Sequence, residues 1–220
     1  MSGSATELLQ PHLLAFMGTG LLVTLRIAVL SILFSFALGT LIGIIRYSKI
    51  PGLSQLAGFY VEALRNSPLL LLILAARFVI GGMKPVNCVI LAMTLFTSAV
   101  LAEVVRGGLA SVDRGQWEAA LSQGFTYVQA LRYVVLPQAL RKMIPPMVSQ
   151  FITVIKDTSY AWVVGVEELT GSGMIILGQY GSTAQFFAVF GFIALLYYVL
   201  CHLLSRLARW QERRLAWLSY

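Results

Sequence analysis

Long apolar runs separated by short polar segments dominate the sequence. Residues 27–45 contain no charged side chain and lie between Arg26 and Arg46. A helix needs about 20 such residues to cross the hydrocarbon core of a bilayer. The pattern predicts an all-α integral membrane protein that forms a single domain over residues 1–220. Its five transmembrane helices are expected over about residues 20–46, 59–82, 85–106, 142–166 and 186–205.

Two local features refine this expectation. Gly39 and Gly43 are four residues apart in the first span, a spacing that permits close packing of two helices. Pro145 and Pro146 lie near the start of the fourth span and predict a kink there.

The composition excludes several classes of protein. Hydrophobic residues make up 58% of the chain and charged residues 11%, with a mean hydropathy of +0.82. A soluble domain carries about 25% charged residues, so a soluble enzyme, a disordered tail and a secreted disulfide scaffold are excluded. Cys88 and Cys201 lie in apolar stretches and are expected to be small buried hydrophobes. No metal site is predicted.

Lys and Arg are unevenly distributed among the segments that connect the predicted spans. On one side lie Arg46, Lys49, Arg106, Arg114, Arg132, Arg141, Lys142 and the four arginines from Arg206 onward. On the other side lies Lys84. Because basic residues concentrate in cytoplasmic loops, we expect the N-terminus outside and the C-terminus in the cytoplasm. The net charge of +7 then faces anionic membrane lipid, and no nucleic-acid partner is expected.

The longest polar segment, residues 107–141, is predicted to be a cytoplasmic loop with two short helices. Asp113 and Thr126 are the expected N-caps, and Gln129 completes a capping-box spacing with Thr126. Gly124 is expected to end the first helix and Pro137 the second. Apolar residues recur at helical spacing along the second helix: Phe125, Val128, Leu131, Val135 and Leu136. This apolar face predicts contact with the lipid surface or with a groove on a partner protein.

The loop also carries a family motif. Glu118-Ala119-Ala120 is followed after three residues by Gly124, and after nine more by Val134-Val135-Leu136-Pro137. This run resembles the EAA loop of bacterial ABC importer permeases, with Val134 in place of the usual isoleucine. Residues 65–70, 102–109 and 156–159 resemble further segments of the polar amino-acid subfamily.

The resemblance implies a type I ABC importer permease in a bacterial cytoplasmic (inner) membrane. Such an importer has two permease subunits, two ATP-binding subunits and an extracytoplasmic solute-binding protein, and the second permease is either another copy or a related chain. Glu118, Ala119, Ala120, Gly124, Leu136 and Pro137 would belong to the surface that couples to the ATPase. The chain has no G-x-x-x-x-G-K-[ST] loop, so no cofactor is expected here, and ATP and Mg would bind to the partner.

Charged residues inside a membrane are costly and commonly functional. Arg77 lies twelve residues beyond Arg65, or roughly 18 Å along a continuous helix. Lys156 and Asp157 are expected at a similar depth, beyond Lys142. We therefore predict a solute site formed by Arg77, Lys156, Asp157, Thr158 and Glu103.

Structural roles are the alternative for these charges. Arg77 and Asp157 would then form an ion pair. Glu103 would pair with Arg106, and Glu62 with Arg65, since both pairs have i,i+3 spacing.

The predicted function is ATP-driven import of polar amino acids, with glutamate, aspartate or glutamine as the solute. Basic amino acids or cystine are alternative solutes. A non-transporting membrane scaffold that docks a partner through residues 113–137 is the alternative of another class. A membrane-embedded enzyme is not favoured, because the two histidines of the sequence belong to no catalytic motif; no catalytic residue is predicted.

Overall fold

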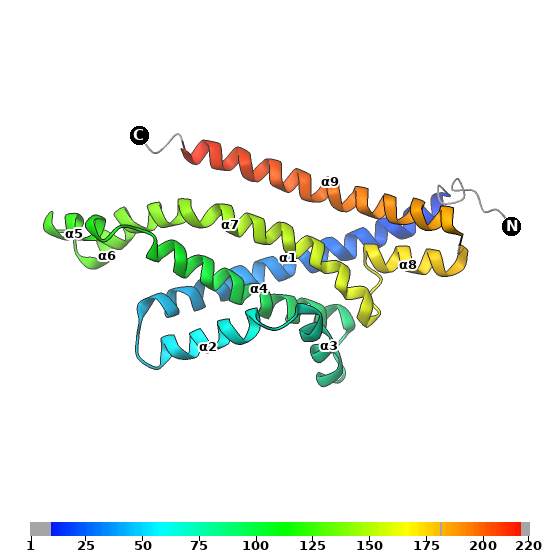
Figure 1. Ribbon diagram of the computed structural model, residues 1–220, viewed down its shortest axis with the longest axis horizontal. Helices are drawn as coiled ribbons and strands as arrows, with labels where there is room; N and C mark the ends of the chain where they lie inside the picture. Colours follow the sequence, from blue (N-terminus) through cyan, green and yellow to red (C-terminus); the bar gives the residue numbers. More distant parts are fainter. Residues whose placement is uncertain (1–9, 181, 217–220) are drawn as a thin grey trace. The chain divides into compact units, whose positions relative to one another are not determined.

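The computed structural model of the protein describes residues 10–180 and 182–216, and in these residues it contains helices and no β-strand (Figure 1). The elements follow one another in this order: α1 (Pro11–Ser48), α2 (Leu53–Arg65), α3 (Leu69–Val79), α4 (Pro85–Ala110), α5 (Arg114–Ser122), α6 (Tyr127–Ala130), the π-helical segment η2 (Leu131–Val135), α7 (Leu136–Asp157), the 3₁₀ segment η3 (Thr158–Val164), α8 (Leu169–Tyr180) and α9 (Thr183–Ala216).

Three helices within the described residues are long and apolar enough to span a membrane: α1, α4 and the Thr183–Trp210 part of α9. Two bent pairs, α2 with α3 and Tyr127–Val164 with Leu169–Gly178, would raise the number to five if each pair forms one span. The segments expected from the sequence overlap these helices and pairs. The chain divides into two compact units, which we describe separately. The first unit comprises residues 1–33, 68–94 and 152–204, and the second comprises residues 34–67, 95–151 and 205–220.

The second expected span, residues 59–82, is not one continuous helix. Helix α2 ends at Arg65, and α3 begins at Leu69 after Pro68, whose φ of −64° and ψ of 129° are extended. Proline lacks an N–H and disfavours helical geometry at the residue before it, so the chain leaves the helix at this point although its apolar character continues. The helical rise from Arg65 to Arg77 therefore does not give the depth of Arg77.

The first unit has an apolar core where the beginnings of α1 and α9 meet α8 (Figure 1). Each helix contributes two buried side chains, namely Leu13 and Met17, Leu169 and Ile176, and Val189 and Ile193. Helix α8 approaches its neighbours closely through glycines. A Cβ at Gly173 would lie 2.2 Å from Cδ1 of Ile193, and a Cβ at Gly20 of α1 would lie 2.3 Å from Oγ of Ser172.

The second unit has its core between α4 and the η2–α7 segment. Its buried residues are Leu101, Val105, Leu109, Val112, Val135, Ala139, Met143 and Met147. The C-terminal part of α1 packs against α4 through the predicted glycine pair. A Cβ added at Gly39 would lie 2.7 Å from the backbone carbonyl oxygen of Ser98, and one added at Gly43 would lie 2.6 Å from that of Ala102. The expected close helix packing is confirmed.

Candidate functional site

The two short helices of the polar segment begin where the sequence predicts them, after Asp113 and Thr126. The Asp113 side chain caps α5 by accepting a hydrogen bond from the backbone N–H of Gly115 at 2.6 Å. The helix ends at Ser122, and Gly124 has a φ of 86°, a conformation that strongly favours glycine. Thr126 and Gln129 form a complete capping box at the start of α6.

Pro137 does not end the second helix, which corrects the prediction. The chain continues from α6 through η2 into α7, and Pro137 is the second residue of α7. The residue before it, Leu136, still donates its backbone N–H to the carbonyl of Leu131 five residues earlier, so the helical run has no free N-terminus here. The preceding π-helical turn changes the hydrogen-bond register before the proline is reached.

The residues predicted to couple to an ATPase lie on α5, on the turn after it and at the start of α7. Ala120 is buried, whereas the other members are exposed: Glu118, Ala119, Gly124, Leu136 and Pro137. Large side chains in the same segment are also exposed: Phe125 at 39%, Tyr127 at 60%, Val128 at 69% and Tyr133 at 61%. This segment therefore presents an apolar and aromatic surface that no described residue of the chain covers.

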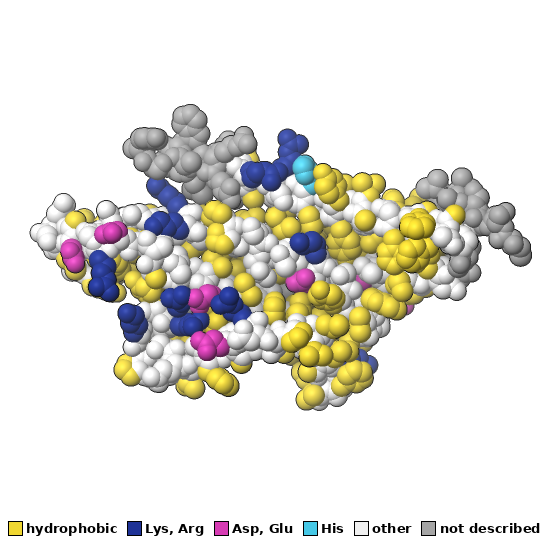
Figure 2. Space-filling view, viewed as in Figure 1, with side chains coloured by type: hydrophobic (Ala, Val, Ile, Leu, Met, Phe, Trp, Pro, Cys, Tyr) yellow, Lys and Arg dark blue, Asp and Glu magenta, His cyan; other side chains and the backbone are white. Residues whose placement is uncertain are grey.

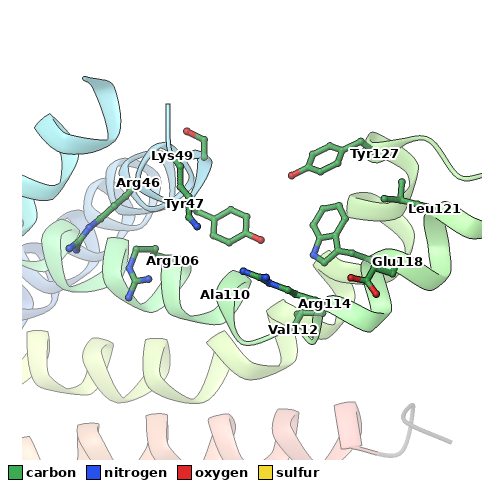
Figure 3. Close-up of a pocket in the computed structure, with 12 residues that line it drawn as sticks. Arg46, Tyr47, Lys49, Arg106, Ala110, Val112, Arg114, Glu118, Leu121 and Tyr127 are labelled. Carbon is green, nitrogen blue, oxygen red and sulfur yellow. The ribbon is translucent and has the colours of Figure 1, made fainter. Parts of the chain in front are cut away.

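A hollow of about 630 Å³ lies beside this segment, within the second unit (Figure 3). Figure 3 shows Tyr47, Lys49 and Arg106 on one side of it and Glu118, Leu121 and Tyr127 on the other. The Trp117 ring also lines the hollow and stacks on Tyr127, with the ring centroids 4.7 Å apart.

Charged side chains gather over α2 and α4 in the second unit (Figure 2). The Glu103 carboxylate accepts hydrogen bonds from Arg46, at 2.5 Å between Nη1 and Oε2, and from Arg106. The predicted Glu103–Arg106 pair is therefore present. Glu62 bonds to Arg46 at 3.3 Å, so the predicted Glu62–Arg65 pair is wrong, because Arg46 from α1 reaches the carboxylate instead. Both Glu103 oxygens have guanidinium partners, which fits the structural alternative for this residue.

The other predicted solute residues all belong to the first unit. Arg77 is half-buried on α3, Lys156 is exposed and Asp157 is half-buried at the end of α7, and Thr158 is fully buried at the start of η3. Helix α3 packs against η3. Within the described residues, Arg77 and Asp157 form no ion pair, so the structure does not contain the alternative Arg77–Asp157 bridge.

Glu168 is a buried polar residue that was not among the predicted site residues. It directly precedes α8, and its side chain accepts hydrogen bonds from the backbone N–H groups of Thr170 at 2.9 Å and Gly171 at 2.8 Å. These are two of the N–H groups that a helix leaves without partners at its N-terminus. The helix dipole also favours a carboxylate at this position.

Two hydroxyl groups from distant segments complete the shell around Glu168. The Tyr197 hydroxyl of α9 donates to Oε2 at 3.0 Å, and the Thr24 hydroxyl of α1 donates to the same oxygen at 3.3 Å. Thr24 in turn accepts a hydrogen bond from the backbone N–H of Leu169 at 3.1 Å. We call Thr24, Glu168, Thr170, Gly171 and Tyr197 the Glu168 cluster.

One signal in the sequence could have indicated this cluster. An acidic residue stands immediately before an apolar helix, in a stretch with no Lys or Arg from Asp157 to Ser205. Such a residue has no Lys or Arg near it in the sequence, so when it is buried its carboxylate needs uncharged hydrogen-bond donors. The buried Thr158 borders the cluster, with its hydroxyl 3.4 Å from that of Tyr197.

Apolar helices of membrane-spanning length, joined by an exposed segment of short helices, are typical of an integral membrane protein. Residues 35–217 match the family described as binding-protein-dependent transport system inner membrane component, and the chain belongs to this family. This confirms the resemblance to ABC importer permeases.

Individual relatives agree with this assignment. The probable glutamine ABC transporter permease protein GlnP of Bacillus subtilis (strain 168) is 47% identical over 209 residues, which cover 93% of this chain and 95% of that protein. The L-cystine transport system permease protein TcyL of the same organism is 34% identical, over 88% of this chain and 84% of that protein. A solved structure described as the crystal structure of an amino acid ABC transporter with histidines has a TM-score of 0.87 and 28% identity, over 97% of this chain and 100% of that chain.

Proposed function

We propose that this chain is the permease subunit of an ATP-driven importer of glutamine and the acidic amino acids glutamate and aspartate. The observation that carries the proposal is the 47% identity to the GlnP permease over 93% of this chain. Glutamate and aspartate are included because a second carboxylate is a natural partner for the cations of the predicted site.

The residues of the first unit have the chemistry that an amino acid requires. Every amino acid carries an α-carboxylate and an α-ammonium group. Lys156 can donate to the α-carboxylate, and Arg77 can bond both oxygens of the second carboxylate of glutamate or aspartate. Asp157 can accept from the ammonium group. The packing of α3 against η3 and the absence of an Arg77–Asp157 ion pair within the described residues support a site whose charges are available for solute.

Energy for transport would come from separate ATP-binding subunits that bind ATP and Mg. The exposed surface of α5 and α6 would dock into a cleft on such a subunit and transmit its movement to the membrane helices. An extracytoplasmic binding protein would deliver the solute, and a second permease subunit would complete the pathway. The complex would lie in the bacterial inner membrane, with the loop 107–141 in the cytoplasm.

The test is uptake by the complete importer, reconstituted in vesicles with its ATP-binding subunits and binding protein. Glutamine, glutamate, arginine and cystine are compared as solutes, with ATP hydrolysis measured in parallel. We expect glutamine and glutamate to enter and to stimulate hydrolysis. Arginine or cystine as the sole solute would overturn the solute assignment, and stimulation by no amino acid would count against the proposed function.

Arg77→Ala tests the site itself, and Lys84→Ala is the matched control because Lys84 is also basic but lies in the connection between α3 and α4. A hydrogen bond to a charged group is worth enough that its loss should weaken glutamate uptake about tenfold or more. We expect a smaller loss for glutamine, which has one carboxylate. If the Arg77→Ala variant takes up each solute as well as the Lys84→Ala variant does, Arg77 does not belong to the site.

A further inference from the structure

The hollow beside α5 adjoins the surface proposed to dock the ATP-binding subunit, with Glu118 belonging to both, and its lining suits a further ligand. Four cationic side chains line it, namely Arg46, Lys49, Arg106 and Arg114, together with the rings of Tyr47, Trp117 and Tyr127. Glu118 is the acidic residue of the described lining. Such a combination of cations and aromatic rings is suited to an anionic group that carries an apolar portion.

The four cations are not equivalent. Arg46 and Arg106 already bond to the carboxylates of Glu62 and Glu103. In the described part of the chain, Lys49 and Arg114 have no carboxylate partner within ion-pair distance. In Figure 3 the side chains of Tyr47 and Arg114 extend toward each other across the hollow. The hollow therefore retains two cations that can bind an anion without breaking an existing pair.

The position of the hollow along α1 indicates the source of the anion. The uncharged run of α1 ends at Arg46, and the hollow begins at that residue. Leu41 and Ile44, just before it on the same helix, are 57% and 49% exposed. The hollow thus opens where the helix leaves the apolar layer, next to apolar side chains that acyl chains can cover. Tyr and Trp are also favoured at this level of a membrane.

We propose that this hollow binds the phosphate headgroup of an anionic phospholipid, with Lys49 and Arg114 as its ligands and the lipid chains against the exposed face of α1. Basic pockets beside membrane helices bind anionic headgroups in this manner. The proposal rests on the membrane assignment and not on the identity of the solute. It gives the importer a lipid contact next to the α5–α6 surface, where bound lipid can influence docking of the ATP-binding subunit.

The test uses Trp117 as a reporter inside the hollow. The full chain carries four tryptophans, and the other three are replaced by phenylalanine. This protein is reconstituted in phosphatidylcholine vesicles that contain a minor fraction of either brominated phosphatidylglycerol or brominated phosphatidylcholine. Bromine quenches tryptophan fluorescence only at short range. We expect markedly stronger quenching by the anionic lipid, and no competition from millimolar inorganic phosphate.

Two variants examine the ligands. Lys49→Gln and Arg114→Gln should each lower the preference for the anionic lipid about fivefold, as expected for one basic residue near a membrane surface. Lys84→Gln is the matched control and should leave the preference unchanged. Far-ultraviolet circular dichroism checks that each variant folds. The comparison of the two brominated lipids uses protein that retains Lys49 and Arg114, so it does not depend on either variant.

Three outcomes would overturn the proposal. Equal quenching by the two lipids would show no selectivity for the anionic headgroup. Displacement by inorganic phosphate would assign the hollow to a soluble phosphate. Loss of the selective quenching when the ATP-binding subunit is added would assign the hollow to the protein interface. None of these outcomes bears on solute uptake, so failure here leaves the proposed function intact.

Discussion

Two glutamates, one in each unit of this chain, receive hydrogen bonds from donors of different kinds. Glu103 lies in the second unit, where guanidinium groups of Arg46 and Arg106 bond to its carboxylate, and its side chain is 25% exposed. Glu168 lies in the first unit, is fully buried, and is bonded by two backbone N–H groups and two hydroxyls. The first carboxylate depends on opposite charge, whereas the second depends on neutral donors held at fixed positions.

The two carboxylates are therefore expected to contribute differently to stability. A partly exposed ion pair adds little stability, because water and salt weaken it and two long side chains must be ordered. A buried carboxylate with several fixed donors is costly to remove, because each donor then loses its partner in a place water does not reach easily. We therefore expect the Glu168 cluster to matter more for stability than the network around Glu103, although the latter contains more charge.

The largest expected effect follows from Glu168→Ala. This change leaves the N–H groups of Thr170 and Gly171 and the hydroxyls of Thr24 and Tyr197 without their acceptor. Since each unsatisfied buried donor costs about 1–3 kcal/mol, we expect a loss of about 3 kcal/mol or more, measured as the free energy of unfolding in detergent. Glu167→Ala is the matched control, because Glu167 is the exposed neighbour. Equal stability of the two variants would contradict the comparison.

Helices α1 and α4 pack closely beside the Glu103 network. Gly43 packs on Ala102, the residue before Glu103, and its Cβ would lie 2.6 Å from the Ala102 oxygen. Gly43→Ala should push α1 away from α4 and lower the free energy of unfolding by about 1–3 kcal/mol, as overpacking does. Gly107→Ala is the control, because nothing lies within 4 Å of a Cβ at that position. If Gly43→Ala raises the free energy of unfolding, the Glu103 network does not depend on the close contact between α1 and α4.

The third prediction tests the ion network directly through Glu103→Gln, which keeps the size of the side chain and removes its charge. We expect a loss of about 1 kcal/mol at low salt, because the site is partly exposed. Raising the salt concentration should reduce this loss, since salt screens charges near the surface. The loss in Glu168→Ala should be independent of salt. Thermal unfolding at several salt concentrations measures both variants, and equal salt dependence would mean that the two carboxylates are stabilised in the same way.

The sequence predicts the local features of this structure well. The capping box at Thr126, the turn at Gly124 and the glycine pair of α1 all depend on residues a few positions apart, and all are present. Errors arise where an apolar run conceals a break. Pro68 interrupts an apolar segment that reads as one span, whereas Pro137 lies within a continuous helical run, directly after a π-helical turn.

The Glu168 cluster could not be predicted in the same way, because its partners are far apart in the chain. Thr24 precedes Glu168 by 144 residues, and Tyr197 follows it by 29. The pairing of Arg46 with Glu62 and Glu103 has the same origin, since Arg46 lies on another helix. Spacing within one helix suggests Glu62–Arg65, but it cannot show that a third residue competes for the same carboxylate.

The smallest effect is expected for Glu62→Gln, which removes the outer carboxylate of the Glu103 network. The Glu62 side chain is 69% exposed and lies 3.3 Å from Arg46, so the pair is largely solvated. We expect a change below about 0.5 kcal/mol in the free energy of unfolding. Arg46 keeps its contact with Glu103, so the Glu103→Gln effect should be nearly the same with and without Glu62→Gln. A double-mutant cycle measures this directly, and a strong coupling between the two changes would mean that Glu62 and Glu103 act on Arg46 as one unit.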